Sequence, residues 1–314
     1  MSRRGLAYAA AVGLFAAFPE TALAAPNHSE WGTPVSLGCG VVNTAYNDFG
    51  PGVSKDGLSL YFGSDRAAPG KPLDIYVSQR PSVDAPWGTP VLVPNVNTAF
   101  AENVVSLSRD GHWMFFNSNR PDGLGDLDIW ASYRAHIHDD FDWQAPVNLG
   151  PGVNSELFEA GASYFENDGG MPQLFFGRGQ SSSLQFTTTK IMVSEQLPDG
   201  TFGNAHEVTE LNLPGNGSQR PSIRFDGLEI FFYANNRPGG FGGSDIWVAE
   251  RTSIDAAWDE PTNLGSVVNT DLAEFQPHIS ADGLALYFAT NRTDGACGGW
   301  DVYVTTRLRV QGRD

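Results

Sequence analysis

The stretch "SRDGHWMFFNSNRPDGLGDLDIW", residues 108–130, decides the fold, because its pattern recurs along the chain. An Asp-Gly turn, an aromatic run, an arginine, a glycine-rich loop and an aspartate follow one another in it. The same order returns in "SADGLALYFATNRTDGACGGWDVY", residues 280–303. An order of features that returns in this way indicates an internal repeat, and a repeat outweighs any local motif when a fold is predicted.

The repeats have a regular period. A motif resembling "WGTPV" opens one segment of each, at Trp31, Trp87, Trp143, Phe202 and Trp258. These five positions are spaced by 56, 56, 59 and 56 residues. Asp-Gly pairs recur in step, beginning at Asp56, Asp110, Asp168, Asp226 and Asp282. The chain therefore contains five units.

Each unit reads as four short β-strands. Residues 101–149 contain "ENVVSLS", "HWMFFNS", "LDIWASYR" and "WQAPVNL", which lack helical periodicity and are rich in residues that suit a pleated sheet. Units of four strands arrayed around an axis form a β-propeller. The sequence therefore predicts an all-β, five-bladed β-propeller with four antiparallel strands in each blade, named A to D from the innermost outward.

The two ends of the repeat region predict how the ring closes. The first unit begins with a D strand, "WGTPVSL" (31–37), and the last ends on a C strand, "WDVYVTT" (300–306). The N-terminal strand can therefore complete the last blade and remove an open edge. Cys39 and Cys297 then fall on one face, and we predict a disulfide with a Cα–Cα distance of about 4.4–6.8 Å. Two free thiols, or pairing between chains, are the alternatives.

The repeats resemble the WD40-like PD40 repeats of TolB-type periplasmic proteins and of exported proteins with OmpA-like domains. The resemblance rests on the two stretches quoted above and covers nearly all of 31–307. Unit 3 departs from it, because Lys190 stands where the other units have aspartate (Asp74, Asp128, Asp245 and Asp301). The resemblance implies a propeller in the cell envelope, without one fixed activity.

The first residues predict export. Residues 1–24 have two arginines, a short apolar run and the small-residue end Ala22-Leu23-Ala24, which is typical of a secretory signal peptide. An uncleaved membrane anchor is the alternative. Residues 25–307 then form a single propeller domain and 308–314 a tail. We expect a periplasmic or secreted monomer without a transmembrane span. Its formal charge of −17 argues against nucleic acid as a partner.

One set of carboxylates recurs at the start of strand A, where it faces the axis. Its members are Asp48, Glu102, Glu159 and Glu274, and Ser218 replaces them in unit 4. The ring of carboxylates could hold a cation such as calcium or a polar ligand. Alternatively, each pairs with the arginine of its unit (Arg66, Arg120, Arg178, Arg237 or Arg292). We favour the ion pairs, because a group found in nearly every repeat usually solves a problem common to every repeat.

The same reasoning gives the repeated arginines and aspartates a structural role. Arg66, Arg120, Arg237 and Arg292, with Asp74, Asp128, Asp245 and Asp301, are expected to hold the B–C loops. His278 breaks the repeat, since the other units have Gly52, Ser106, Tyr164 and Ser222 in its place. Trp113 and Phe241 are the aromatic residues that stand outside the repeat pattern.

Two functions are compatible with these features. The first is an exported, non-catalytic binding or scaffold protein that recognises a protein or polysaccharide through the face formed by the D–A connections and B–C loops. The alternative is a propeller glycoside hydrolase, with Glu102, Glu159, Glu274 and His278 as candidate catalytic residues. We favour the first, because the glutamates are equivalent between repeats. Neither zinc-ligand spacing nor another metal motif is present, and no cofactor is certain.

Overall fold

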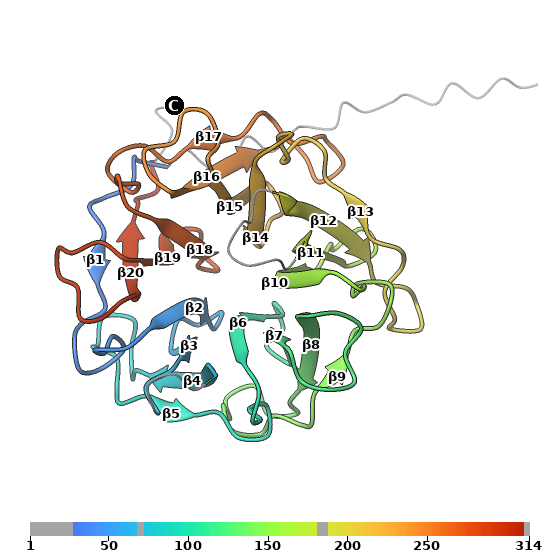
Figure 1. Ribbon diagram of the computed structural model, residues 1–314, viewed down its shortest axis with the longest axis horizontal. Helices are drawn as coiled ribbons and strands as arrows, with labels where there is room; N and C mark the ends of the chain where they lie inside the picture. The colour runs from blue at the N-terminus through green and yellow to red at the C-terminus, as the bar shows by residue number, and fades with distance from the viewer. Residues whose placement is uncertain (1–27, 68–71, 181–187, 311–314) are drawn as a thin grey trace, which may run out of the picture.

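The protein is a five-bladed β-propeller, as Figure 1 shows for the computed structural model. The structure describes residues 28–67, 72–180 and 188–310. Within them, five antiparallel sheets of four strands surround one axis, which confirms the predicted fold class. No helix in these ranges is long and apolar enough to cross a membrane. The predicted signal peptide (1–24) lies outside the described residues.

Each blade runs from a strand at the axis to a short strand at the outside. Blade 1 contains β2 (Asp48–Val53), β3 (Ser59–Ser64), β4 (Asp74–Gln79) and β5 (Val91–Leu92). Blade 2 contains β6 (Glu102–Leu107), β7 (Trp113–Ser118), β8 (Asp128–Tyr133) and β9 (Val147–Asn148). Blade 3 contains β10 (Phe158–Phe165), β11 (Gln173–Gly179), β12 (Lys190–Glu195) and β13 (His206–Glu207). Blade 4 contains β14 (Gly217–Ile223), β15 (Glu229–Asn235), β16 (Ser244–Glu250) and β17 (Thr262–Asn263).

Blade 5 joins the two ends of the described chain. It contains β18 (Glu274–Ile279), β19 (Ala285–Thr290), β20 (Asp301–Thr306) and β1 (Val35–Ser36). Val35 pairs with Val304, and Ser36 with Tyr303, in an antiparallel register. The N-terminal strand therefore completes the last blade, as the sequence predicts.

The predicted disulfide is confirmed. Cys39 and Cys297 are bonded, and their Cα atoms are 5.3 Å apart. The bond lies just beyond the β1–β20 pairing, so it ties the closing strand to the B–C loop of the blade that it completes. The ring is therefore held closed by a covalent bond as well as by the backbone hydrogen bonds between β1 and β20.

The core lies between neighbouring blades. The aromatic run of each B strand is almost fully buried, since blades cover it from both sides. Tyr61 of blade 1 meets Trp143 of blade 2 edge to face at 6.2 Å, and Trp31 meets Phe231 of blade 4 at 5.9 Å. Such offset and edge-to-face contacts suit the aromatic quadrupoles. Every blade thus needs its neighbour in order to bury its own sheet.

Two further repeated devices brace the blades. An asparagine in each D–A connection makes two hydrogen bonds to the main chain of one residue in strand C. Asn97, for example, accepts from the Ile75 amide (2.7 Å) and donates to the Ile75 carbonyl (2.9 Å). The set is Asn43, Asn97, Asn154, Asn212 and Asn269. An arginine after strand C also lies over the next tryptophan, in the pairs Arg80–Trp87, Arg134–Trp143, Arg251–Trp258 and Arg307–Trp31. Neither set was predicted from the sequence.

Candidate functional site

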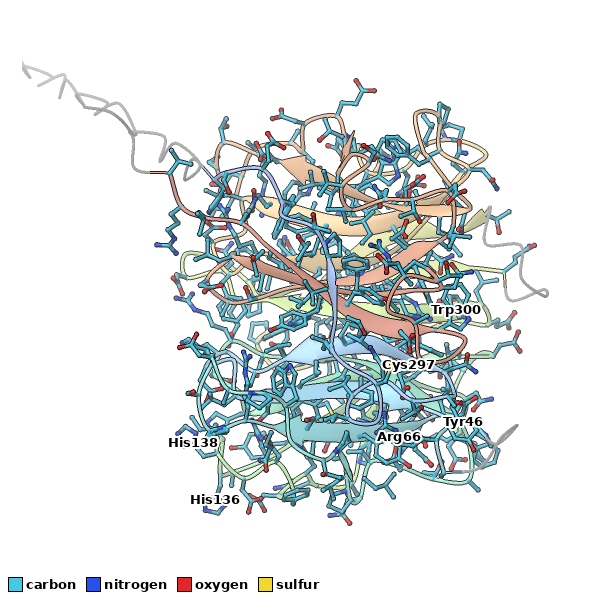
Figure 2. All side chains as sticks on the ribbon, turned by 90° about the vertical axis from the view of Figure 1, so that its left-hand side faces the viewer. Tyr46, Arg66, His136, His138, Cys297 and Trp300 are labelled. Carbon is cyan, nitrogen blue, oxygen red and sulfur yellow. A yellow bond between two sulfur atoms is a disulfide. The ribbon has the colours of Figure 1, made fainter. Side chains whose placement is uncertain are left out.

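The D–A connections and B–C loops share one face of the ring. In Figure 2, Tyr46 and Arg66 lie on the same side of the molecule as Cys297 and Trp300. His136 and His138, from the C–D link of blade 2, lie on the opposite side. We call the first side the loop face.

The repeated carboxylates lie just beneath the loop face, and both oxygens of each accept hydrogen bonds from the protein. Glu102 accepts from the Thr98 amide (2.8 Å) and hydroxyl (2.7 Å), from Ser118 Oγ (2.8 Å) and from Arg120 Nη2 (3.1 Å). The matching ion pairs are Asp48–Arg66, Glu159–Arg178 and Glu274–Arg292, and all four carboxylate side chains are 0% exposed. Each carboxylate thus ties a D–A connection to a B–C loop within its own blade.

This geometry argues against a ring of axial carboxylates. None of Asp48, Glu102, Glu159 and Glu274 lines the cavity on the axis. Among the described residues, no group of three or more His, Cys, Asp or Glu side chains is placed to hold a metal ion. The three glutamates proposed as alternative catalytic residues have no exposed oxygen with which to reach a substrate. They are supports of the loop face.

Blade 4 is the exception to this arrangement. Ser218 replaces the carboxylate and donates from Oγ to the Leu211 carbonyl (3.2 Å). Arg237 keeps its place over Phe232 and Trp247, and donates to the same carbonyl (2.9 Å). Blade 4 therefore carries a guanidinium at the loop face without the acid that accompanies it in the other blades.

The repeated aspartates hold the glycine-rich loops. Asp128 accepts from the amides of Leu124 (2.5 Å) and Gly125 (3.1 Å), and Asp301 accepts from that of Cys297 (2.6 Å). Asp245 does the same for Phe241 (2.9 Å), and Asp74 occupies the equivalent place in blade 1. In blade 3, Lys190 instead pairs with Glu207 on the neighbouring strand (2.6 Å).

His278 links two neighbouring blades, blade 5 and blade 1, near the axis. Its Nε2 accepts a hydrogen bond from the Val53 amide of blade 1 (3.0 Å). Ser163 and Ser222 accept in the same way with Oγ for the following blades, so the histidine replaces a repeated serine. The predicted blade 3 equivalent, Tyr164, is therefore wrong by one residue, because the register of β10 places Ser163 at this position. Burial lowers the pKa of His278 to about 4, and the ring is therefore neutral near pH 7. This contact gives His278 a structural task and does not support the catalytic alternative.

We expect the pH dependence of stability to report on this histidine. An unfolded histidine titrates near pH 6.5. The unfolded chain therefore takes up more protons than the folded one between pH 6.5 and about 4, and stability is lost as the pH falls through that window. The loss is at most about 3 kcal/mol, an upper limit because the ring is partly open to the axial cavity.

The His278→Ser substitution provides the matched variant, since serine fills this role in two other blades. Urea unfolding at pH 7 and pH 4.5 should show a smaller acid-induced loss of stability in the variant than in the wild type. Parallel losses in the two proteins would contradict the assignment.

An asymmetric group of aromatic side chains lies where the loop face meets the axis. Phe275 at the start of β18 contacts Trp300 edge to face at 4.5 Å and Phe49 of β2 at 6.2 Å. Tyr233 of blade 4 supports Phe275 from below at 5.9 Å and donates to Gln219 Oε1 (3.0 Å). Phe49, Phe275 and Trp300 are partly exposed, whereas Tyr233 is buried. We call these four residues the axial aromatic cluster.

The cluster is not part of the repeat. The residues equivalent to Phe49 and Phe275 are Asn103, Ala160 and Gln219, and those equivalent to Trp300 are Leu73, Leu127, Thr189 and Ser244. The cluster was not predicted from the sequence, although these substitutions are visible when the five units are aligned position by position. An aromatic residue confined to two blades has no structural task common to all five, which marks it as a candidate binding residue.

Exposed apolar side chains also lie on the loop face. Tyr46, Phe100 and Leu157 occupy one repeated position, two residues before the carboxylate, and are 36%, 39% and 37% exposed. Phe241, which the sequence singled out, is 50% exposed on a B–C loop. Trp113, also singled out, follows an Asp-Gly turn and packs on Tyr133 at 5.1 Å, away from this face. The loop face therefore combines a partly buried aromatic centre with an apolar rim.

Comparison with solved structures identifies the same architecture in carbohydrate-active enzymes. The native arabinanase of Bacillus subtilis aligns with a TM-score of 0.60 and 13% identity, over 87% of this chain and 97% of that one. The family-43 endo-arabinanase of Bacillus licheniformis aligns with 0.57 and 14%, over 84% and 94%. An endo-arabinase of Bacteroides thetaiotaomicron aligns with 0.54 and 15%, over 91% and 99%. At these identities the comparison establishes a shared fold.

No family model and no curated protein matches the chain. The predicted membership of the PD40 and TolB-type proteins is therefore wrong, since the solved structures that share the fold include family-43 glycoside hydrolases. The same finding contradicts the preference for a non-catalytic scaffold, since solved structures that share the fold are glycoside hydrolases. The error arose from treating the regularity of the repeat as evidence about its function.

Proposed function

We propose that the protein is a carbohydrate-active enzyme that binds a glycan on the loop face and cleaves a glycosidic bond there. The observation that carries the proposal is the axial aromatic cluster, which departs from the repeat at the one place where all five blades converge. The glycosidases that share the fold support the class of reaction.

The chemistry of the cluster suits a sugar. The face of a pyranose or furanose ring presents C–H groups, which are attracted to the negative face of an aromatic ring. Trp300 and Phe275 meet at 73°, so together they form a corner in which a sugar ring can rest on one side chain and abut the other. The exposed Tyr46 and Phe100 extend the same kind of surface outward, as a polymer with several sugar units requires.

Hydrolysis requires two carboxyl groups about 5–10 Å apart on either side of the bond. The four repeated carboxylates are unsuitable, because each is buried and hydrogen-bonded on both oxygens. Acids that remain exposed on the D–A connections and B–C loops include Glu156, Asp271 and Asp294. We propose that the catalytic pair comes from such loop acids. The signal peptide predicted at 1–24 would place the activity outside the cytoplasm, where polysaccharides are found.

Substitution of Trp300 by alanine is expected to weaken glycan binding at least tenfold, since the lost aromatic contact is worth about 1.4 kcal/mol or more. Titration calorimetry or affinity electrophoresis against arabinan, xylan and pectic polysaccharides would measure the change. Trp113→Ala is the control, because it removes a solvent-accessible tryptophan from the opposite face. Equal binding by the two variants would contradict the assigned site.

Release of reducing sugar from the bound polysaccharide tests the second half of the proposal. We expect Glu156→Gln, Asp271→Asn or Asp294→Asn to lower the rate of release without lowering affinity by the same factor. A protein that binds a glycan but releases no sugar from any polysaccharide in the panel would contradict the hydrolytic role and leave the binding site standing.

A further inference from the structure

Arg220 occupies an unusual position on the axis. All five innermost strands contain a β-bulge at the same point, with a residue of positive φ in it. These residues are Gly50, Val104, Gly161, Arg220 and Gln276. A Cβ added to Gly161 would lie 2.4 Å from Cγ of Arg220, so the arginine stem packs directly against the backbone of blade 3. The fold therefore places one guanidinium at the narrowest part of the ring.

This guanidinium lines a small cavity and is not neutralised. The axial cavity has a volume of about 20 Å³, and its wall includes Arg220, Ser106, Gln276 and His278, with no carboxylate among its lining residues. Nε and Nη1 of Arg220 are buried and have no hydrogen-bond partner among the described residues. Arg220 also forms no ion pair within the described ranges. The hydroxyl of Tyr233, an ionisable neighbour of Arg220, already donates to Gln219.

Arg220 as a whole is half-buried, but burial of its Nε and Nη1 without a partner is costly, which is why buried charged groups in proteins are normally paired. The two other arginines of blade 4 that lack a carboxylate each donate to a main-chain carbonyl, Arg237 to that of Leu211 and Arg251 to that of Gly227. Arg220 has no comparable acceptor. Ser106, on the same cavity, has a buried Oγ that is also without a partner. Gln276 Oε1, also on this cavity, is a buried neutral acceptor without a partner, but none of the residues that line the cavity carries a negative charge to match Arg220.

We propose that the axial cavity binds a small monovalent anion of the size of chloride, held by Arg220 and the Ser106 hydroxyl. The volume suits one water-sized occupant and excludes the carboxylate group of a sugar. The positive charge of Arg220 excludes a metal cation. His278 is neutral near pH 7, so Arg220 supplies the charge that selects an anion. The bound anion would offset the buried charge and hold the five bulges together.

Thermal melting of the mature protein in different sodium salts tests this site. At constant ionic strength, replacing gluconate by chloride or bromide should raise the melting temperature in a saturating manner, because a ligand that binds only the folded state stabilises it by mass action. Gluconate is too large for the cavity. Arg220→Met should lose the chloride-specific rise, whereas Arg109→Gln, which removes an arginine paired with Asp168 on the surface, should keep it.

A direct measurement covers the case in which the Arg220 variant fails to fold. Crystals of the wild-type protein grown or soaked in bromide should show an anomalous peak within hydrogen-bond distance of the Arg220 guanidinium. Absence of that peak, with only water at the axis, would overturn the proposal whatever the melting data show. A chloride-specific rise that persists in Arg220→Met would overturn it as well. Failure of either test leaves the glycan site on the loop face unaffected.

Discussion

Loss of the Cys39–Cys297 disulfide is expected to lower the free energy of unfolding by as much as about 5 kcal/mol, the largest effect of any single change considered. The bond closes a loop across a sequence separation of 258 residues, and the entropy that a cross-link removes from the unfolded chain grows with loop length. The strand that it retains, β1, has only two paired residues and an exposed edge. Without the bond, β1 should detach before the rest of the ring unfolds.

Comparison of the wild type with the Cys39→Ser, Cys297→Ser double variant by chemical denaturation measures this effect. Dithiothreitol should lower the stability of the wild type towards that of the variant and leave the variant unchanged. Amide hydrogen exchange should show faster opening at 35–36 and 301–306 in the variant. Indistinguishable denaturation midpoints would show that β1 is held without the covalent link.

Asp140→Ala is expected to destabilise the protein by about 3–5 kcal/mol, because it removes the acceptor from a buried network. The C–D link of blade 2 carries Asp140 into blade 1, where it accepts from Ser59 (2.5 Å), Tyr61 (2.5 Å) and Gln79 (2.6 Å). It also accepts from Arg134 of its own blade (2.7 Å) and is only 3% exposed. The substitution would leave the Arg134 guanidinium buried without its carboxylate.

Urea unfolding of Asp140→Ala beside Asp84→Ala tests this, because Asp84 is an exposed residue of the equivalent link in blade 1. Burial acts to raise the pKa of Asp140, but the hydrogen bonds from Ser59, Tyr61, Arg134 and Gln79 outweigh it and hold the pKa below its usual value. The carboxylate therefore stabilises the fold above about pH 4, and its contribution is lost as the pH falls below that through the folded pKa. A similar small effect for both variants would contradict the bridging role.

The fold was predictable because its signals are repeated and local. The Asp-Gly turns, the aromatic runs and the spacing of Trp31, Trp87 and Trp143 each recur. A strand that is hard to assign in one unit can therefore be assigned from the equivalent strands of the other units. The exchange of β1 into blade 5 followed from counting strands, and the disulfide followed from that exchange. Pairing between the repeated arginines and acids was also anticipated, since a group present in each unit must meet a need present in each unit.

The candidate site was harder to predict, because it consists of departures from the repeat. Phe275 and Trp300 belong to units that otherwise match the pattern well, and the pattern drew attention to what they share with the other units. The positions equivalent to Arg220 in the other units hold glycine, valine and glutamine. Because this position has no consensus residue, the arginine does not stand out as a departure from the repeat. The task of His278 depends on a partner 225 residues away in the chain, which only the closed ring brings beside it.

Ring closure also has a consequence for timing. The pairing of Val35 with Val304 joins residues whose synthesis is separated by 269 positions (304 − 35). At a translation rate of roughly 5–20 residues per second, that interval is on the order of tens of seconds. Throughout it, the segment that becomes β1 has no partner strand, and blade 1 has no blade 5 against which to bury its outer side. The first blade made is therefore among the last to be finished, and a product truncated before β20 would carry an unsatisfied strand at one end and an uncovered sheet at the other.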